Sequence, residues 1–456
     1  MKTANNITVS EFDIIHCNEN IDSCDSRLKK IDEPVFNELV SFINEYNSSC
    51  EFVSPDLFLK IERRLNIGNV ITVKGYVGVI SLKSGIQIEI LPKIDLSNNG
   101  DYCKTRRILV AMLQTLRGFN NRFYKQASLN VRKMNIFEIF ISMYLNRLSF
   151  LTKQGLKSGY ITEEDNLKFF RGRLLVSEHL KTNLTHKEKF YLAYDEFSVN
   201  CAENRLIKST LLRLKSISRS SSNLQEIIRQ LVYFENIDES HNLDKDFNHC
   251  SSNDRNYPEY NSIIEWSKIF LQNKGFTSFT GGNSATALLF EMNKIFEGYV
   301  TRILKKEFEN YYDDIKLVAQ DTAISLFDIP RPIFKLKPDI VIKKRSNNLP
   351  ILVMDTKWKT VSSDVRNNYG LSQADMYQMY AYGKKYNVRE VWLIYPTTNI
   401  SNDLKDLYFE SNDNFIIRIK FFDLSSSIYK EKIKVIKKDF IEDNELLKEI
   451  MRDNYN

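Results

Sequence analysis

Two short apolar runs, each bounded by an aspartate, constrain the fold of this chain more than any other feature. Asp339 comes directly before the run 340–342, and Asp355 closely follows the run 351–353. The polar residues between the runs predict a turn, and the whole segment predicts a β-hairpin. Side chains two residues apart share a face of a strand, so Asp355 and Lys357 are expected on one side. That side changes from apolar to charged at its end.

The charged end of this hairpin indicates a site for chemistry. Two carboxylates brought close together raise each other's pKa unless a cation neutralises them. An all-oxygen pair of this kind suits a hard divalent ion such as Mg²⁺. Lys357 would then orient or deprotonate a water molecule. The alternative is a hairpin end that carries only a salt-bridged Asp–Lys pair.

Length and composition set the class of protein. A chain of 456 residues with 43% hydrophobic residues predicts a folded protein of about three domains. The net charge of +6 permits nucleic-acid binding without requiring it. None of the 6 cysteines has a C-x-x-C spacing, which indicates neither a zinc site nor a disulfide framework and fits a cytoplasmic protein. The longest apolar run, 136–145, contains Glu138 and is too short to span a membrane, so no membrane partner is expected.

The first part of the chain, residues 1–125, predicts a mixed, β-rich domain. One helix is expected from Pro34 and a second from Pro55 to Gly68, because apolar residues follow each proline at helical spacing. Strands are expected next, and they alternate in the manner of a half-buried antiparallel sheet, at 70–73, 76–80 and 86–90.

Residues 126–255 predict a mainly helical region. Within it, a segment that interleaves basic and aromatic residues contains Arg171 and Arg173, which would contact DNA phosphates or else lie on a solvated strand edge. The polar segment 238–256 is interpreted as a linker with exposed histidines.

Residues 256–456 predict an α/β domain with a mixed sheet flanked by helices. A helix is expected from 284 to 311, with Glu297 at the margin of its apolar face and Glu291 on the polar side. Glu297 is a candidate site residue, or else a member of a boundary salt bridge. A second helix, from Ser372, would carry Gln378 and Tyr382 one turn apart. The fold class expected for the whole chain is therefore α/β and α+β.

Together these residues resemble the PD-(D/E)xK nuclease superfamily, through Asp339, Asp355-x-Lys357, a helix glutamate and Gln378-x-x-x-Tyr382. More closely, the chain resembles the McrC family, the nuclease subunit of McrBC-type modification-dependent restriction systems. The resemblance covers most of the chain between about Ile71 and Tyr395. The matching stretches are 76–80, 88–93, 170–174, 194–197, 204–205, 289–297 and 374–382.

The resemblance implies a Mg²⁺-dependent DNA endonuclease with a PD-(D/E)xK domain. Asp339 and Asp355 would hold Mg²⁺, with Glu297 and the Thr356 carbonyl as further ligands. Lys357 would position the attacking water and stabilise charge in the transition state. Gln378 and Tyr382 would contact double-stranded DNA or support the site.

The resemblance also implies a partner. In the family, the N-terminal part docks on McrB, a hexameric AAA+ GTPase that recognises modified DNA. No Walker A loop occurs in this chain, which agrees with nucleotide binding by another protein. Two alternatives remain open: an adaptor that activates the GTPase without cutting DNA, and a standalone nuclease of the DNA-repair type.

Overall fold

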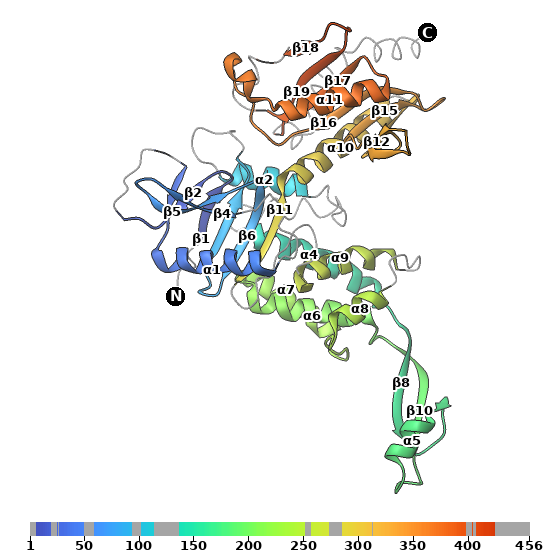
Figure 1. Cartoon of the computed structure of the whole chain (residues 1–456). Helices are drawn as coiled ribbons and strands as arrows, with labels where there is room; N and C mark the ends of the chain where they lie inside the picture. The colour runs from blue at the N-terminus through green and yellow to red at the C-terminus, as the bar shows by residue number, and fades with distance from the viewer. Residues whose placement is uncertain are drawn as a thin grey trace. The chain divides into compact units, whose positions relative to one another are not determined.

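The computed structural model describes residues 6–19, 25, 27–49, 59–93, 102–113, 136–250, 257–272, 285–311, 313–397, 404 and 407–424. The chain divides into two compact units (Figure 1). One unit combines residues 1–120 with 281–456, and the other spans 121–280. Helices and several mixed sheets occur together, as the predicted α+β class requires. The finer division at 125 and 255 stays a prediction.

Two four-stranded sheets form the N-terminal part of the first unit. The first sheet has the order β1 (Asn6–Ser10), β7 (Gln87–Leu91), β6 (Tyr76–Leu82) and β11 (Ala285–Glu291). The second has the order β3 (Leu28–Lys30), β2 (Ile14–His16), β5 (Gly68–Val73) and β4 (Leu59–Arg64). The three predicted strands are confirmed, but they belong to two sheets, and each sheet also contains one parallel pair. Helix α1 (Glu33–Ser49) begins beside Pro34 as predicted, and α2 is Tyr102–Leu113.

Two of the predicted helices are wrong over part of their length. Residues 59–64 of the helix expected between Pro55 and Gly68 form β4, because they pair along their length with β5. Residues 285–291 of the helix expected from 284 form β11, which pairs antiparallel with β6. Residues 285–291 are a short, mostly apolar run, whose periodicity does not separate strand from helix, whereas residues 59–64 contain only two apolar residues. The missing information was the distant strand that pairs with each of them.

Gly78 shows how closely β6 and β11 approach. Its φ is +143°, and a Cβ atom there would lie 2.0 Å from the Leu288 carbonyl oxygen. No side chain fits at that distance, so this pairing requires glycine.

A six-stranded mixed sheet forms the C-terminal part of the first unit. Its order is β12 (Ile315–Ala319), β15 (Ile340–Lys344), β16 (Pro350–Thr356), β17 (Glu390–Pro396), β19 (Ile416–Phe422) and β18 (Tyr408–Glu410). Strands β15 and β16 form the predicted antiparallel hairpin, whereas β17 runs parallel to both β16 and β19. The small hairpin of β13 (Ser325–Phe327) and β14 (Ile333–Lys335) and the short helix η2 (Val365–Gly370) complete this part.

Helices α10 (Met292–Tyr311) and α11 (Gln373–Tyr386) pack against this sheet (Figure 1). α11 begins after Ser372 as predicted, although the Ser372 side chain caps no backbone N–H. It buries Met379, Tyr382 and Tyr386 against residues of four strands, among them Val341 and Val353. Burial of such large side chains stabilises a core by ~2 kcal/mol each, so α11 is held firmly over the hairpin.

The second unit is mainly helical, as predicted. Its helices are α4 (Ile136–Gln154), α6 (Ala202–Ile217), α7 (Ser221–Tyr233), α8 (Leu243–His249) and α9 (Pro258–Gln272). A three-stranded antiparallel sheet of β8 (Gly159–Leu167), β10 (Phe190–Ser198) and β9 (Arg173–Leu174), with α5 (Val176–Thr182), lies in the same unit.

The segment predicted to be a linker contains helix α8. The Asn242 side chain caps α8 by accepting a hydrogen bond from the Lys245 N–H. Asp246 then forms an ion pair with Arg205 of α6 at 2.6 Å. The polar composition of this segment thus serves a cap and an ion pair, and its two histidines, His241 and His249, are exposed as predicted.

Among the residues that the structure describes, neither a membrane-spanning helix nor a disulfide is found. The helices in this part of the chain are too short or too polar to cross a bilayer. Its four cysteines, at positions 17, 103, 201 and 250, are free.

Candidate functional site

The register of the hairpin places Asp339 directly across from Asp355. Ile340 pairs with Met354, so the residue before one strand faces the last part of the other. Asp339 Oδ2 accepts hydrogen bonds from the Thr356 backbone N–H and hydroxyl, each at 2.7 Å. These bonds fix the Asp339 carboxylate against β16 and beside Asp355.

Asp355 is almost completely buried, with 2% of its surface exposed. Burial and the neighbouring charge of Asp339 raise the pKa of Asp355 to about 7. Burial also raises the pKa of Asp339, against the opposing effect of its hydrogen bonds from Thr356. One buried and one half-buried carboxylate therefore lie close together at the end of the hairpin.

Lys357 is held among polar groups of the hairpin and α11. Its Nζ lies 2.6 Å from Asp355 Oδ2 and donates to Gln378 Oε1 at 3.3 Å. Gln378 in turn donates to the Tyr382 hydroxyl at 2.7 Å. Burial lowers the pKa of Lys357, but the carboxylates of Asp355, Asp375 and Asp339 together outweigh it and raise that pKa. Lys357 is thus a fixed cation at neutral pH.

Glu297 reaches the site from α10. It is half-buried, as expected for the margin of an apolar face, and its Oε1 accepts a hydrogen bond of 2.6 Å from Gln320 Nε2. Burial and the charge of Asp339 raise the pKa of Glu297. The boundary salt bridge considered for Glu297 is made by another residue, since Lys294 pairs with Glu291 at 2.7 Å. The structure thus brings together Asp339, Asp355, Lys357, Glu297, Thr356, Gln378 and Tyr382.

The donor set fits a hard divalent cation. The Asp355 Oδ2 oxygen is buried and, apart from its ion pair with Lys357, has no hydrogen-bond partner. Within the described residues, no three His, Cys, Asp or Glu side chains are grouped closely enough to enclose a metal by themselves. Mg²⁺ does not require such a cage, because it binds through one or two carboxylates and keeps several waters. Asp339 and Asp355 with the Thr356 carbonyl would meet that requirement.

The sequence prediction missed two residues that contact this site and a third, Trp358, that follows Lys357 in the chain. Gln320 binds Glu297. Asp375, in the first turn of α11, pairs with Lys359 at 2.8 Å and lies 3.9 Å from Lys357. Trp358 donates from Nε1 to the buried Glu11, 347 residues away, at 2.8 Å. Asp375 lies three residues after Ser372, which is the spacing of a capping box, so its position was visible in the sequence. The contacts of Gln320 and Trp358 depend on tertiary structure.

Arg171 and Arg173 lie in the second unit and are not part of this cluster. The Arg171 guanidinium stacks over the Tyr194 ring at 4.2 Å and lies 3.9 Å from Glu196. Arg173 is exposed on the edge strand β9. Their role in DNA binding stays a prediction.

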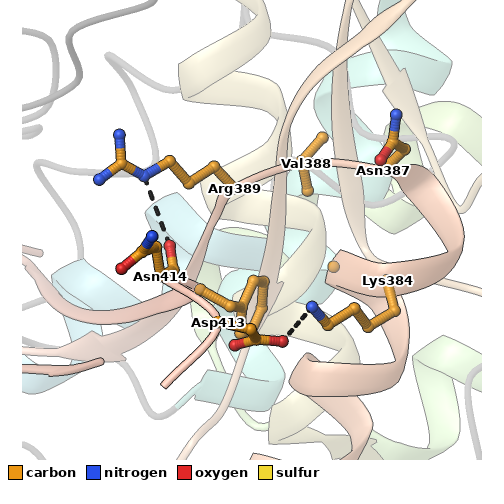
Figure 2. A pocket seen from close by; sticks show the side chains of 8 residues that line it. Lys384, Asn387, Val388, Arg389, Asp413 and Asn414 are labelled. Carbon is orange, nitrogen blue, oxygen red and sulfur yellow. Dashed lines mark hydrogen bonds and ion pairs between the residues drawn. The ribbon is translucent and has the colours of Figure 1, made fainter. Parts of the chain in front are cut away.

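A polar pocket of about 490 Å³ lies at the C-terminal end of α11 (Figure 2). Its charged side chains are already paired: Lys384 forms an ion pair with Asp413, and Arg389 donates to the Asn414 carbonyl. The pocket contains none of the site residues named above, and we assign it no function.

The fold and the site define a mixed α/β protein with an acidic, lysine-bearing site at the end of a central hairpin. This class of site suits a hard metal ion and an anionic substrate. The chain belongs to the family described as McrBC 5-methylcytosine restriction system component, whose model matches residues 71–396.

A solved structure confirms the fold. The chain is similar to a chain of the refined half-complex from the tetradecameric assembly of Thermococcus gammatolerans McrB AAA+ hexamers with bound McrC. The TM-score is 0.66 at 18% identity, over 96% of this chain and 99% of the other. The cryo-EM structure of the T. gammatolerans McrBC complex also matches, with a TM-score of 0.47 at 18% identity, over 66% of this chain and 87% of that chain. No curated protein is significantly similar in sequence.

Proposed function

We propose that this chain is the Mg²⁺-dependent DNA endonuclease subunit of a GTPase-driven restriction system, with a PD-(D/E)xK active site. The observation that supports this most strongly is the grouping of Asp339, Asp355 and Lys357 at one end of the hairpin. Glu297 from α10 and Gln378 from α11 extend the group. A structural ion pair would need neither the second carboxylate nor the convergence of two helices.

Each acidic residue has a defined task in this proposal. Asp339 and Asp355 would hold Mg²⁺ together with the Thr356 carbonyl, with Glu297 as a further ligand, directly or through water. The bound ion would supply Lewis-acid stabilisation of the phosphoryl oxygens and would lower the pKa of a bound water. Thr356 keeps Asp339 oriented, since two of its groups donate to one carboxylate oxygen.

Lys357 stabilises negative charge in this proposal. Its raised pKa keeps the ammonium protonated at neutral pH, which favours charge stabilisation and water orientation over proton abstraction. Asp355 and Gln378 hold its Nζ on two sides. Gln378 and Tyr382 would in turn fix Lys357 or contact the DNA, and Arg171 and Arg173 would contact backbone phosphates elsewhere.

A McrB-like AAA+ GTPase is the proposed partner. The family model describes a 5-methylcytosine restriction system, and the structural neighbour contains McrB AAA+ hexamers with bound McrC. We propose that the chain docks on such a hexamer, stimulates its GTPase, and cuts DNA containing 5-methylcytosine that the partner delivers.

The test uses the full chain with its McrB-like partner, GTP, Mg²⁺ and methylated DNA. Asp355→Ala should abolish cleavage but keep GTPase stimulation. Glu410→Ala, on the exposed edge strand β18 of the same sheet, is the matched control and should cut normally.

The outcomes separate the alternatives. Undiminished cleavage by Asp355→Ala would refute the active site. GTPase stimulation without cleavage by the unaltered chain would identify an adaptor. Cleavage that needs neither partner nor GTP would identify a standalone nuclease.

A further inference from the structure

Gln320 adopts a backbone conformation that is costly for its residue type. It follows the last residue of β12 and has a φ of 48°, in the left-handed region. Glutamine has a Cβ atom that crowds the backbone there, and its longer side chain lacks the local hydrogen bonds that help Asn and Asp. Such conformations persist where the surrounding structure imposes them, and they cluster at functional sites.

The surrounding structure does impose it. The Gln320 backbone N–H donates to the Asp339 carbonyl at 2.9 Å and extends the pairing of β12 with β15 by one residue. The next residue, Asp321, is buried and forms an ion pair with Lys343 of β15, while its carbonyl accepts from the Tyr386 hydroxyl of α11. The chain is therefore held on both sides of Gln320.

The side chain of Gln320 points at the acidic cluster. Its Nε2 donates to Glu297 Oε1 at 2.6 Å, although the Gln320 side chain itself is exposed. One residue thus binds the backbone of Asp339 and the carboxylate of Glu297. The charges of Glu297 and Asp339 repel each other, and without a fixed donor the Glu297 side chain would turn toward water.

We infer that Gln320 is a positioning residue of the nuclease site, whose amide holds the Glu297 carboxylate beside Asp339 for the divalent cation. The inference rests on the proposed function. An amide is suited to this task because it donates without charge: it engages one carboxylate oxygen and leaves the negative charge available to the metal. A lysine in its place would compete with the cation.

Gln320→Gly tests the inference, because glycine keeps the backbone N–H, adopts a positive φ without strain and removes the side chain together with its amide. We expect Mn²⁺ affinity, measured by EPR titration of the full chain, to fall about ten-fold or more. The melting temperature should equal or exceed that of the unaltered chain. A merely structural Gln320 would lower the melting temperature and leave Mn²⁺ affinity unchanged, which would overturn the inference.

Asn348→Gly is the matched control. Asn348 has a φ of 59° in the turn between β15 and β16, so the control also places a glycine at a positive φ, away from the acidic cluster. Its Mn²⁺ affinity should be unchanged, and an equal loss there would also overturn the inference.

A double variant establishes the route of the effect. If Gln320 acts through Glu297, then Glu297→Gln with Gln320→Gly should bind Mn²⁺ no more weakly than Glu297→Gln alone. Additive losses would contradict this route. Failure of the unaltered chain to bind Mn²⁺ at all would instead refute the metal site of the proposed function.

Discussion

Replacing Asp355 by asparagine should stabilise the metal-free protein at alkaline pH while it removes a proposed Mg²⁺ ligand. Burial and Asp339 raise the pKa of Asp355 from 3.8 to about 7, so the folded state binds this proton more tightly than the unfolded chain. Raising the pH strips the proton from the unfolded chain first. The free energy of unfolding therefore falls as the pH rises toward the folded pKa and levels off above it.

The size of the effect follows from the two pKa values. Between pH ~5 and pH ~7 the folded state keeps a proton that the unfolded chain has released. At ~1.4 kcal/mol per pH unit, the free energy of unfolding falls by ~3 kcal/mol over this range. Because Asp339 and Asp355 titrate as a pair, this loss belongs to the pair and is an upper figure. Asparagine has no proton to lose, so the free energy of unfolding of Asp355→Asn should not fall in this way. Between pH ~5 and pH ~7 its stability relative to the unaltered chain should therefore rise by up to ~3 kcal/mol.

The assay is denaturant unfolding in EDTA at pH ~5 and pH ~8, followed by tryptophan fluorescence, to which Trp358 and Trp392 of this unit contribute. Glu410→Gln on the exposed strand β18 controls for the loss of one carboxylate. Saturating Mg²⁺ should then stabilise the unaltered chain and leave Asp355→Asn unaffected. Parallel pH dependences of the two proteins in EDTA would refute a shared, buried carboxylate pair.

Three further substitutions test a buried hydrogen bond and a packing contact in the same unit. Trp358→Phe removes the donor to the buried Glu11 and should lower the free energy of unfolding by about 1–3 kcal/mol. Burial raises the pKa of Glu11 to about 8, so its carboxyl is protonated near neutral pH and Glu11→Gln should cost less. Equal losses for the two substitutions would contradict this hydrogen bond. Gly383→Ala places a Cβ 2.0 Å from the buried Phe415 ring and should destabilise the chain by about 1–3 kcal/mol despite the better helix propensity of alanine. A higher melting temperature for Gly383→Ala would contradict that packing.

The sequence predicts the hairpin and its charged end because both are local. The alternation of side chains along a strand determines which residues lie on the same face, and the pairing of β15 with β16 follows from the short turn between them. The helix from Ser372 is local for the same reason. The grouping of seven predicted site residues therefore required little tertiary information beyond the packing of α10 and α11.

The segments that sequence reasoning misread depend on partners far along the chain. β4 and β11 become strands because β5 and β6 offer backbone groups to pair with, which no local pattern reveals. The sequence did not indicate a role for Gln320 for a related reason. That role depends on a left-handed backbone conformation imposed by β15 and α11, which a glutamine in the sequence does not predict.

The correction at β11 changes how the site is attached to the rest of the first unit. α10, which carries Glu297, begins directly where β11 ends, and the Met292 N–H donates to the Gly75 carbonyl just before β6. A helix that began at 284 would have no strand of the N-terminal sheet directly before it to fix its position. Instead it grows from the edge strand of the N-terminal sheet, whose Gly78 admits β11 at a distance that no other residue type allows. The position of the third carboxylate is therefore set by the sheet that residues 76–91 form, through a backbone connection of six residues from Glu291 to Glu297.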